Sequence, residues 1–311
     1  MNFRWEALEL LATALSELAT NTKGASDVRS RLFFQGGSEC EALRRVAEDV
    51  TNNAKHLSTY QISRFAEAFA LLGYRDENFF AVLSGEVRKK RDNLTGSQIS
   101  RLCWAYTQLD IQDTQLTQTL VKAARSYDRH EYLSVGNRAR IGWSLTHLSP
   151  KDVKAVLTPP FLEDDECSID TWALMYQALL LSGQISRGDR FPRYREVHNQ
   201  AMQLASSQLE EDVAHALTRY LKHVPHALER QQCVGGVFVD LLLYLESRTV
   251  AIECDGVRYH FSSGPDGGKR FGKDLVQQQV LEALNMEVVH ITCQEWKDTP
   301  TRRLLSMKLG L

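Results

Sequence analysis

Hydrophobic residues recur every three or four positions from the N-terminus to about Leu221, and strand-like alternation is rare in this stretch. Such a period is typical of amphipathic helices, so an all-helical region is expected over residues 1–229. Beyond Arg230 the pattern changes. The runs VGGVFVDLLLYL and RTVAIECDG are rich in valine, leucine and isoleucine, with a turn near residues 246–248, and they predict two adjacent strands.

The helical half contains an internal repeat. The segment LSTYQISRFAEAFALLGY from Leu57 recurs as LTGSQISRLCWAYTQLDI from Leu94, and more weakly as LSVGNRARIGWSLTHLSP from Leu133. Second helices are expected at residues 77–89 and 113–126, and degenerate units at residues 3–18 with 41–54 and near Ser168. One helix pair cannot bury its apolar face alone, so the repeat predicts an α-solenoid of roughly five helix-turn-helix units.

The C-terminal part predicts a compact α/β domain over residues 230–311. After the two strands come a loop rich in Gly, Ser and Pro at residues 262–268, a helix at 273–284, a strand at 287–292 and a terminal helix from Thr299. The expected order is therefore ββαβα.

Composition restricts the choice of partners without naming one. The formal net charge is -2, so any surface that binds nucleic acid must be a local one. The six cysteines lack metal-ligand spacing, which favours free thiols in a reducing compartment. No apolar run is long enough for a membrane span, and the Glu-rich start is unlike a targeting peptide. An imported protein would thus be a mature or truncated form.

Acidic residues gather on the two predicted strands. Asp240 lies on the first strand, Glu253 and Asp255 end the second, and His260 follows a short turn. Alternate strand residues share a face, so Glu253, Asp255 and Asp240 are expected to meet. Such a set could hold Mg²⁺ through Asp240 and Glu253 and support phosphodiester cleavage, with His260 as a further catalytic candidate. In the alternative interpretation, Asp240 and His260 only close the turn at Asp255 by hydrogen bonds.

The same residues carry a resemblance to a known family. The run DLLLYLESRTVAIECDGVRYHF, the following KDLVQQQVLEALNMEVVHI and the pair Glu295-Trp296 resemble the RAP domain, an RNA-binding module named for its abundance in apicomplexans. The resemblance covers about the last quarter of the chain and implies a restriction-endonuclease-like fold, in which Asp240 and Glu253 match the paired metal carboxylates. Asp255 stands where such nucleases place a lysine, although Lys269 or Lys273 could substitute for it.

A degenerate site of this kind implies a binding protein without a cofactor, and a Mg²⁺-dependent endoribonuclease is the alternative. The helical half resembles the octotricopeptide-like repeats and the Fas-activated serine/threonine kinase-like family. These resemblances imply a mitochondrial or plastid RNA-binding protein, with a mitochondrial ribosome or its assembly as the preferred setting. The implied partners are organellar rRNA and ribosomal proteins, with no membrane.

The aligned repeats supply candidate RNA contacts in two columns. One column contains Arg64, Arg101 and Arg140, and the other, three residues earlier on the same helix face, contains Gln61, Gln98 and Asn137. Guanidinium groups can neutralise phosphate, and amides can read base edges. Alternatively, both columns are solvated or join neighbouring repeats through salt bridges, and the array could be a scaffold that binds a peptide.

Further basic residues flank the Gly-rich loop and would steer phosphate toward the acidic residues: Lys269, Arg270 and Lys273. The basic runs at residues 88–91 and 302–303 are either solvated or additional RNA contacts. The five tryptophans fall mostly on apolar columns and are expected to pack in the core.

Overall fold

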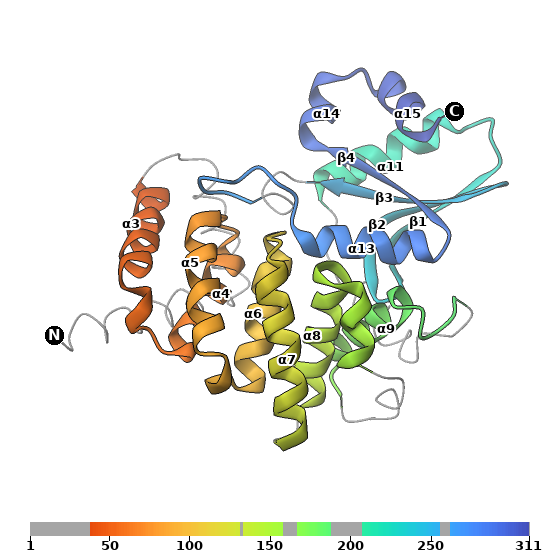
Figure 1. Cartoon of the computed structure of the whole chain (residues 1–311). Coiled ribbons are helices and arrows are strands. Elements are labelled where there is room, and N and C mark those ends of the chain that lie inside the picture. Colours follow the sequence, from red (N-terminus) through yellow and green to blue (C-terminus); the bar gives the residue numbers. More distant parts are fainter. Residues whose placement is uncertain (1–37, 131–132, 158–166, 188–206, 256–261, 311) are drawn as a thin grey trace.

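The computed structural model describes residues 38–130, 133–157, 167–187, 207–255 and 262–310. The chain is helix-rich, with a small mixed sheet in its C-terminal part (Figure 1). This bears out helices followed by an α/β region. The helix expected at residues 3–18, the loop around Pro159 and His260 lie outside the described residues.

The helical part follows the repeat found in the sequence. Its α-helices are α3 (Ser38–Asn53), α4 (Thr59–Leu72), α5 (Glu77–Lys89), α6 (Gly96–Gln108), α7 (Thr114–His130), α8 (Val135–Leu148) and α9 (Ile169–Leu181). Short 3₁₀ helices are η1 (Ala54–His56), η2 (Arg91–Asn93) and η3 (Pro150–Ala155). Helices α4, α6, α8 and α9 pack side by side in chain order, and α5 and α7 form a second layer beside them.

Each helix of the first layer begins with the same cap. Ser58, Thr95, Ser134 and Ser168 accept a hydrogen bond from the backbone N–H three residues later. A hydroxyl at this position satisfies one of the N–H groups that a helix start leaves without a partner. The repeated S/T-x-x pattern thus sets where α4, α6, α8 and α9 begin.

Aromatic and aliphatic side chains fill the space between the helix layers. The repeated apolar column of Phe65, Leu102 and Ile141 is fully buried, as expected for a shared packing face. The rings of Phe69 and Phe79 stack with centroids 4.4 Å apart and join α4 to α5.

The C-terminal part contains a four-stranded sheet in the order β1-β2-β3-β4. Strands β1 (His226–Val234), β2 (Val237–Leu245) and β3 (Thr249–Asp255) form an antiparallel meander, and β4 (Met286–Thr292) pairs parallel to β3. The expected ββαβα order was therefore wrong in two places. Strand β1 was missed, so the sheet begins slightly before residue 230, and a short helix, α14 (Cys293–Asp298), precedes the terminal α15 (Thr301–Leu309).

Helices cover both faces of the sheet and make three layers. On one face, α11 (Gln208–Tyr220) and α15 pack against Leu241, Ile252 and Ile291. On the other face, α13 (Gly272–Ala283) and α9 pack against Leu242 and Ala251. Helix α13 thus lies between the sheet and the helical array, as Figure 1 shows.

The C-terminal part contributes residues to the core of the helical array. Phe271 is fully buried among the residues of the helical array, and its ring tip would lie 2.7 Å from a β-carbon on Gly73. Gly73 ends α4 with φ +70°, a left-handed conformation that suits glycine. No helix in the described ranges is long and apolar enough to cross a membrane.

Candidate nucleic-acid interface and acidic cleft

The three repeated arginines converge on one carboxylate. We call Arg64, Arg101 and Arg140 the arginine column. Arg101 Nε lies 3.2 Å from Glu67 Oε2, Arg140 Nη2 lies 3.1 Å from Glu67 Oε1, and Arg64 Nη1 lies 3.6 Å from Glu67 Oε2. The column therefore joins three successive units, as the salt-bridge interpretation of the sequence stated.

The position of Glu67 explains why only one carboxylate serves three units. Glu67 follows Arg64 by one helical turn, and the matching positions of the next two units are Trp104 and Trp143. In addition to its contact with Glu67, Arg140 lies over the Trp104 ring, with 4.5 Å between the guanidinium carbon and the ring centroid. This cation–π contact holds the third guanidinium in line with the other two.

The arginine column has more positive than negative charge. Three guanidinium groups share one carboxylate, which leaves these four side chains with an excess of two positive charges. The arginine side chains are 18%, 24% and 28% exposed, whereas that of Glu67 is only 10% exposed. The cations are thus nearer to solvent than the anion, and this is the arrangement that attracts a phosphate chain.

The amide column has a different role. Gln61 and Gln98 are the third residues of α4 and α6, and each side chain accepts a hydrogen bond from the N-cap backbone N–H, completing a capping box. Asn137 holds the same position in α8. Its backbone N–H donates a hydrogen bond to Ser134 Oγ, and α8 has a cap without the second bond of a capping box. Helix capping therefore accounts for two of the three amides.

Two of the basic residues around the Gly-rich loop have acidic partners. Lys269 Nζ lies 3.4 Å from Glu77 Oε1, and Arg270 forms an ion pair with the buried Asp255. Lys273 lies over the Phe271 ring at 5.8 Å. These contacts join the loop to its surroundings, and the local sequence pattern does not predict them.

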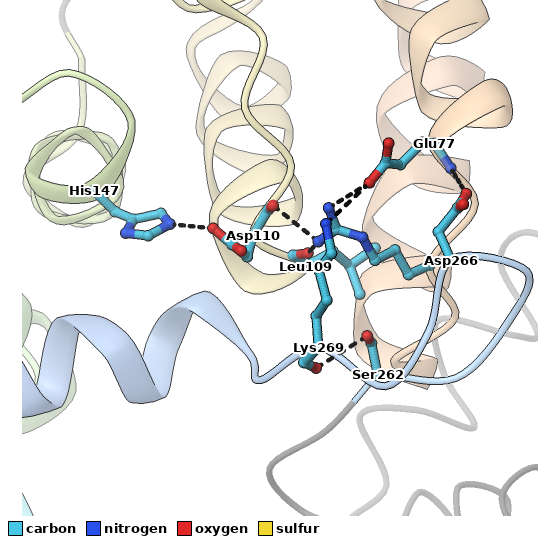
Figure 2. Close-up of polar contacts among 8 residues, drawn as sticks. Glu77, Leu109, Asp110, His147, Ser262, Asp266 and Lys269 are labelled. Atoms are coloured by element: carbon cyan, nitrogen blue, oxygen red, sulfur yellow. Dashed lines mark hydrogen bonds and ion pairs between the residues drawn. The ribbon is translucent and has the colours of Figure 1, made fainter.

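We call residues 262–271 the docking loop, because it pairs with the chain that links α4 to α5. Ser263 donates its N–H to Gly73 O at 2.7 Å, and its carbonyl accepts from Arg75 N at 2.7 Å, as in a parallel bridge. Asp266 accepts from Glu77 N at 2.7 Å (Figure 2). The docking loop thereby pairs with the short segment at residues 73–75, directly after α4.

Arg75 organises the polar side of this contact. It donates to the carbonyl oxygens of Leu109 and Asp110 beyond α6, and to Glu77 at 2.7 Å. The hydrogen bond from Arg75, and a weaker one from Lys269, hold the pKa of Glu77 below its ordinary value. Asp110 in turn bonds His147 of α8 at 2.8 Å, as Figure 2 shows, so the network spans three repeat units.

The acidic residues of the sheet come together as expected. The β2–β3 ladder pairs Leu241 with Ile252, which places Asp240 next to Glu253 at its end. Asp240 Oδ2 accepts a hydrogen bond of 2.8 Å from the backbone N–H of Cys254. This bond closes the end of the ladder, which is the role proposed for Asp240 in the turn-closing interpretation.

Helix α13 covers the face of the sheet that carries these residues. Glu253, Asp255 and His290 line a narrow cleft of about 20 Å³ against Asp274 of α13, and we call it the acidic cleft. Asp255 is 1% exposed and lies 3.1 Å from His290 Nδ1. The cleft has room for about one water molecule, so a polynucleotide cannot enter it without movement of α13.

The electrostatics of the acidic cleft favour a protonated carboxyl. Burial, followed by the charges of Asp240, Asp255 and Asp274, holds the pKa of Glu253 well above its ordinary value, against the opposing effect of Arg270. Within the described ranges, no group of three or more His, Cys, Asp or Glu side chains is arranged to hold a metal ion. Asp240 is bonded to the backbone and Asp255 is paired with Arg270, and the metal site that the resemblance implies for Asp240 and Glu253 stays a prediction.

Comparison with known proteins does not assign the chain to a family. No family model matches it, and no curated protein has a sequence that matches it. The geometry of the site is therefore the main basis for a functional assignment.

Proposed function

We propose that this chain is an RNA-binding protein that contacts the phosphate backbone of single-stranded RNA through the arginine column. The observation that carries the proposal is the convergence of three partly exposed guanidinium groups on one mostly buried carboxylate. A stacked array that presents cations at one position in successive units fits a polyanion with a regular repeat. The exposed ring of Tyr60, one turn before Arg64, adds a stacking surface.

We further propose an organellar setting, with mitochondrial rRNA as the RNA and a mitochondrial ribosome or its assembly as the complex. This part rests on the resemblance of the C-terminal quarter to the RAP domain and of the helices to octotricopeptide-like repeats. The near-neutral net charge supports a role within a ribonucleoprotein, where neighbouring proteins add affinity. A mitochondrial extract in which the protein neither co-sediments with ribosomal particles nor crosslinks to RNA would contradict this setting.

Two substitutions at one ion pair test the arginine column. Glu67→Gln and Arg101→Gln both remove the 3.2 Å contact, but they change the charge of the face in opposite directions. We expect Glu67→Gln to strengthen binding of a single-stranded RNA oligonucleotide and Arg101→Gln to weaken it, each by about three- to tenfold at low salt. Fluorescence anisotropy at several salt concentrations gives both the affinity and the salt slope.

Arg125→Gln is the matched control, because Arg125 is exposed on α7 in the other helix layer. It removes the same charge and should leave the affinity nearly unchanged. If Glu67→Gln and Arg101→Gln weaken binding equally, the pair acts only through stability. RNA binding that none of the three substitutions alters would refute the role of the arginine column.

A metal-dependent endoribonuclease is the second candidate, and the gathering of Asp240, Glu253 and Asp255 on one face of the sheet favours it. The ion pair between Asp255 and Arg270 and the cover of α13 count against it. A peptide-binding scaffold is a weaker candidate, since the excess charge of the arginine column favours a polyanion.

A further inference from the structure

A second surface of the C-terminal part has the features of a nucleotide site. An open groove of about 800 Å³ lies between the last two turns of α11 and the α14–α15 pair. Its volume falls in the range of small-ligand sites, about 300–1,000 Å³. The groove belongs to the face of the sheet that α11 and α15 cover, so it lies on the other side of the sheet from the acidic cleft and the helical array.

Aromatic side chains form part of the groove wall. Trp296 of α14 and Tyr220, the last residue of α11, both line it and both pack partly against the core below. Packing of this kind limits the freedom of the rings before any ligand binds, which lowers the entropic cost of stacking on them. Trp296 was expected in the core, but it reaches this surface.

An ion pair fixes the helix that carries Trp296. Glu295 closes a capping box with Thr292 at the start of α14, and its other oxygen lies 2.7 Å from Lys308 Nζ of α15. These contacts hold the pKa of Glu295 below its ordinary value against the effect of burial, which raises it. The two residues of the Glu295-Trp296 pair therefore have different roles: Glu295 joins α14 to α15, and Trp296 faces the groove.

Guanidinium groups supply the charge. Arg219, in the last turn of α11, and Arg302, in the first turn of α15, line the groove from opposite sides, and both are exposed. No ion pair within the described ranges involves either residue, whereas most arginines of the array are paired. Asp212, one helical turn before His215, also lines the groove. Its one negative charge is fewer than the two positive charges of the arginines, so the charge of these three residues is positive.

From this arrangement we infer that the groove binds one nucleotide of single-stranded RNA, with the base stacked on Trp296 and the flanking phosphates at Arg219 and Arg302. A base needs an aromatic face and a phosphate needs an unpaired cation, and the residues that line the groove offer both. The inference rests on the proposed RNA-binding function and adds a site that the arginine column does not include.

Photocrosslinking tests the inference directly. Oligouridylate with 4-thiouridine is irradiated with the full chain, and the crosslinked peptides are identified by mass spectrometry. We expect a crosslink at the peptide containing Trp296 or at the one containing Tyr220. Trp296→Leu should weaken binding about tenfold, and Trp296→Phe, which keeps a stacking ring, should restore most of it.

Charge substitutions provide a readout that loss of packing would not change. Arg219→Gln with Arg302→Gln should reduce the slope of log Kd against log salt by about 1.4, or about 0.7 for each phosphate contact. Arg303→Gln is the matched control, because Arg303 is the exposed neighbour of Arg302 and does not line the groove. Both arginines of the groove are exposed, so these variants should fold even if Trp296→Leu does not.

The outcomes separate the two proposals. If RNA binds and responds to Arg101→Gln but not to any groove variant, the inference is wrong and the arginine column stands. If no RNA binds at any salt concentration, the proposed function fails, and this inference fails with it. If an acidic peptide such as oligoglutamate binds the groove and RNA does not compete for it, the occupant is a protein segment and the inference is wrong.

Discussion

A β-carbon placed on Gly272 would lie 1.9 Å from the carbonyl oxygen of Thr107, so the start of α13 touches the backbone at the end of α6. No side chain separates the two helices at this point. The contact explains how α13 can serve two cores at once, because close backbone approach brings Phe271 and Val276 into the helical array.

Gly272→Ala is therefore expected to lower the free energy of unfolding by about 1–3 kcal/mol, because the backbone of α6 must shift to admit a methyl group. Gly85→Ala is the control: Gly85 lies inside α5 with open space around it, and alanine there should stabilise by about 0.5–1 kcal/mol. Urea denaturation measures both. Equal free energies of unfolding for the two variants would show that the contact between Gly272 and Thr107 accommodates a methyl group without loss of stability.

Glu67→Gln should destabilise the array by about 2 kcal/mol, between the values typical of exposed and of buried ion pairs. The carboxylate is mostly buried, and its loss leaves three guanidinium groups facing one another. Added salt should restore part of the loss by screening this repulsion. Arg101→Gln should then cost less in the Glu67→Gln background than in the wild type, and strictly additive effects would contradict a shared carboxylate.

The pH dependence of stability should report Glu253. Its folded-state pKa lies above that of the unfolded chain, so the folded protein binds the extra proton. The stability that depends on this proton is complete below the unfolded pKa of about 4.5 and is lost as pH rises through the folded pKa. Glu253→Gln should therefore stabilise the protein at about pH 8 more than at about pH 5. A variant equally stable relative to wild type at both values would indicate an ordinary carboxyl.

Cleavage assays should show no activity that depends on the acidic cleft. Labelled RNA incubated with the protein and Mg²⁺ or Mn²⁺ is expected to give the same background as the variant carrying Asp240→Asn and Glu253→Gln. The physical reason is that Asp255 is ion-paired with Arg270, that Asp240 accepts a hydrogen bond from the backbone N–H of Cys254, and that α13 covers the cleft. Cleavage by the wild type that this variant lacks would instead support the nuclease alternative.

Local signals in the sequence predicted the repeats well. The apolar columns that contain Phe65 and Leu102 are buried, and α5 has the bounds expected from its pattern. The capping boxes at Ser58 and Thr95 could also have been read from the S/T-x-x-Q spacing, which would have given Gln61 and Gln98 a structural role at once.

Long-range contacts explain most of what the sequence did not predict. Strand β1 is polar along most of its length and is the edge strand next to β2 among the described strands, so it lacks the alternation that marks a half-buried strand. Asp266 and Glu77 are 189 residues apart, and no local pattern shows that they meet. For the same reason the sequence predicts a phosphate contact for Lys269 and does not show that Glu77 lies beside it.

The acidic residues of the sheet show both what a local pattern predicts and what depends on long-range contacts. The period of two along a strand was enough to place Asp240, Glu253 and Asp255 on one face. The sequence could not show that α13 would close over this face, because that depends on where the docking loop ends. Arg270 pairs with Asp255 of the acidic cleft, and the next residue, Phe271, packs in the helical array. The docking loop and the acidic cleft are therefore directly connected.

The backbone bonds of Ser263 have a consequence for any ligand longer than one site. Two RNA-contacting surfaces on a flexible tether would act with an effective concentration that changes smoothly with ligand length. Among the described residues, backbone hydrogen bonds of Ser263 to Gly73 and Arg75 fasten the docking loop of the C-terminal part to the helical array. If both proposed surfaces bind RNA, an oligonucleotide too short to reach from one to the other would gain no affinity from the second surface, and one just long enough would gain it in a single step.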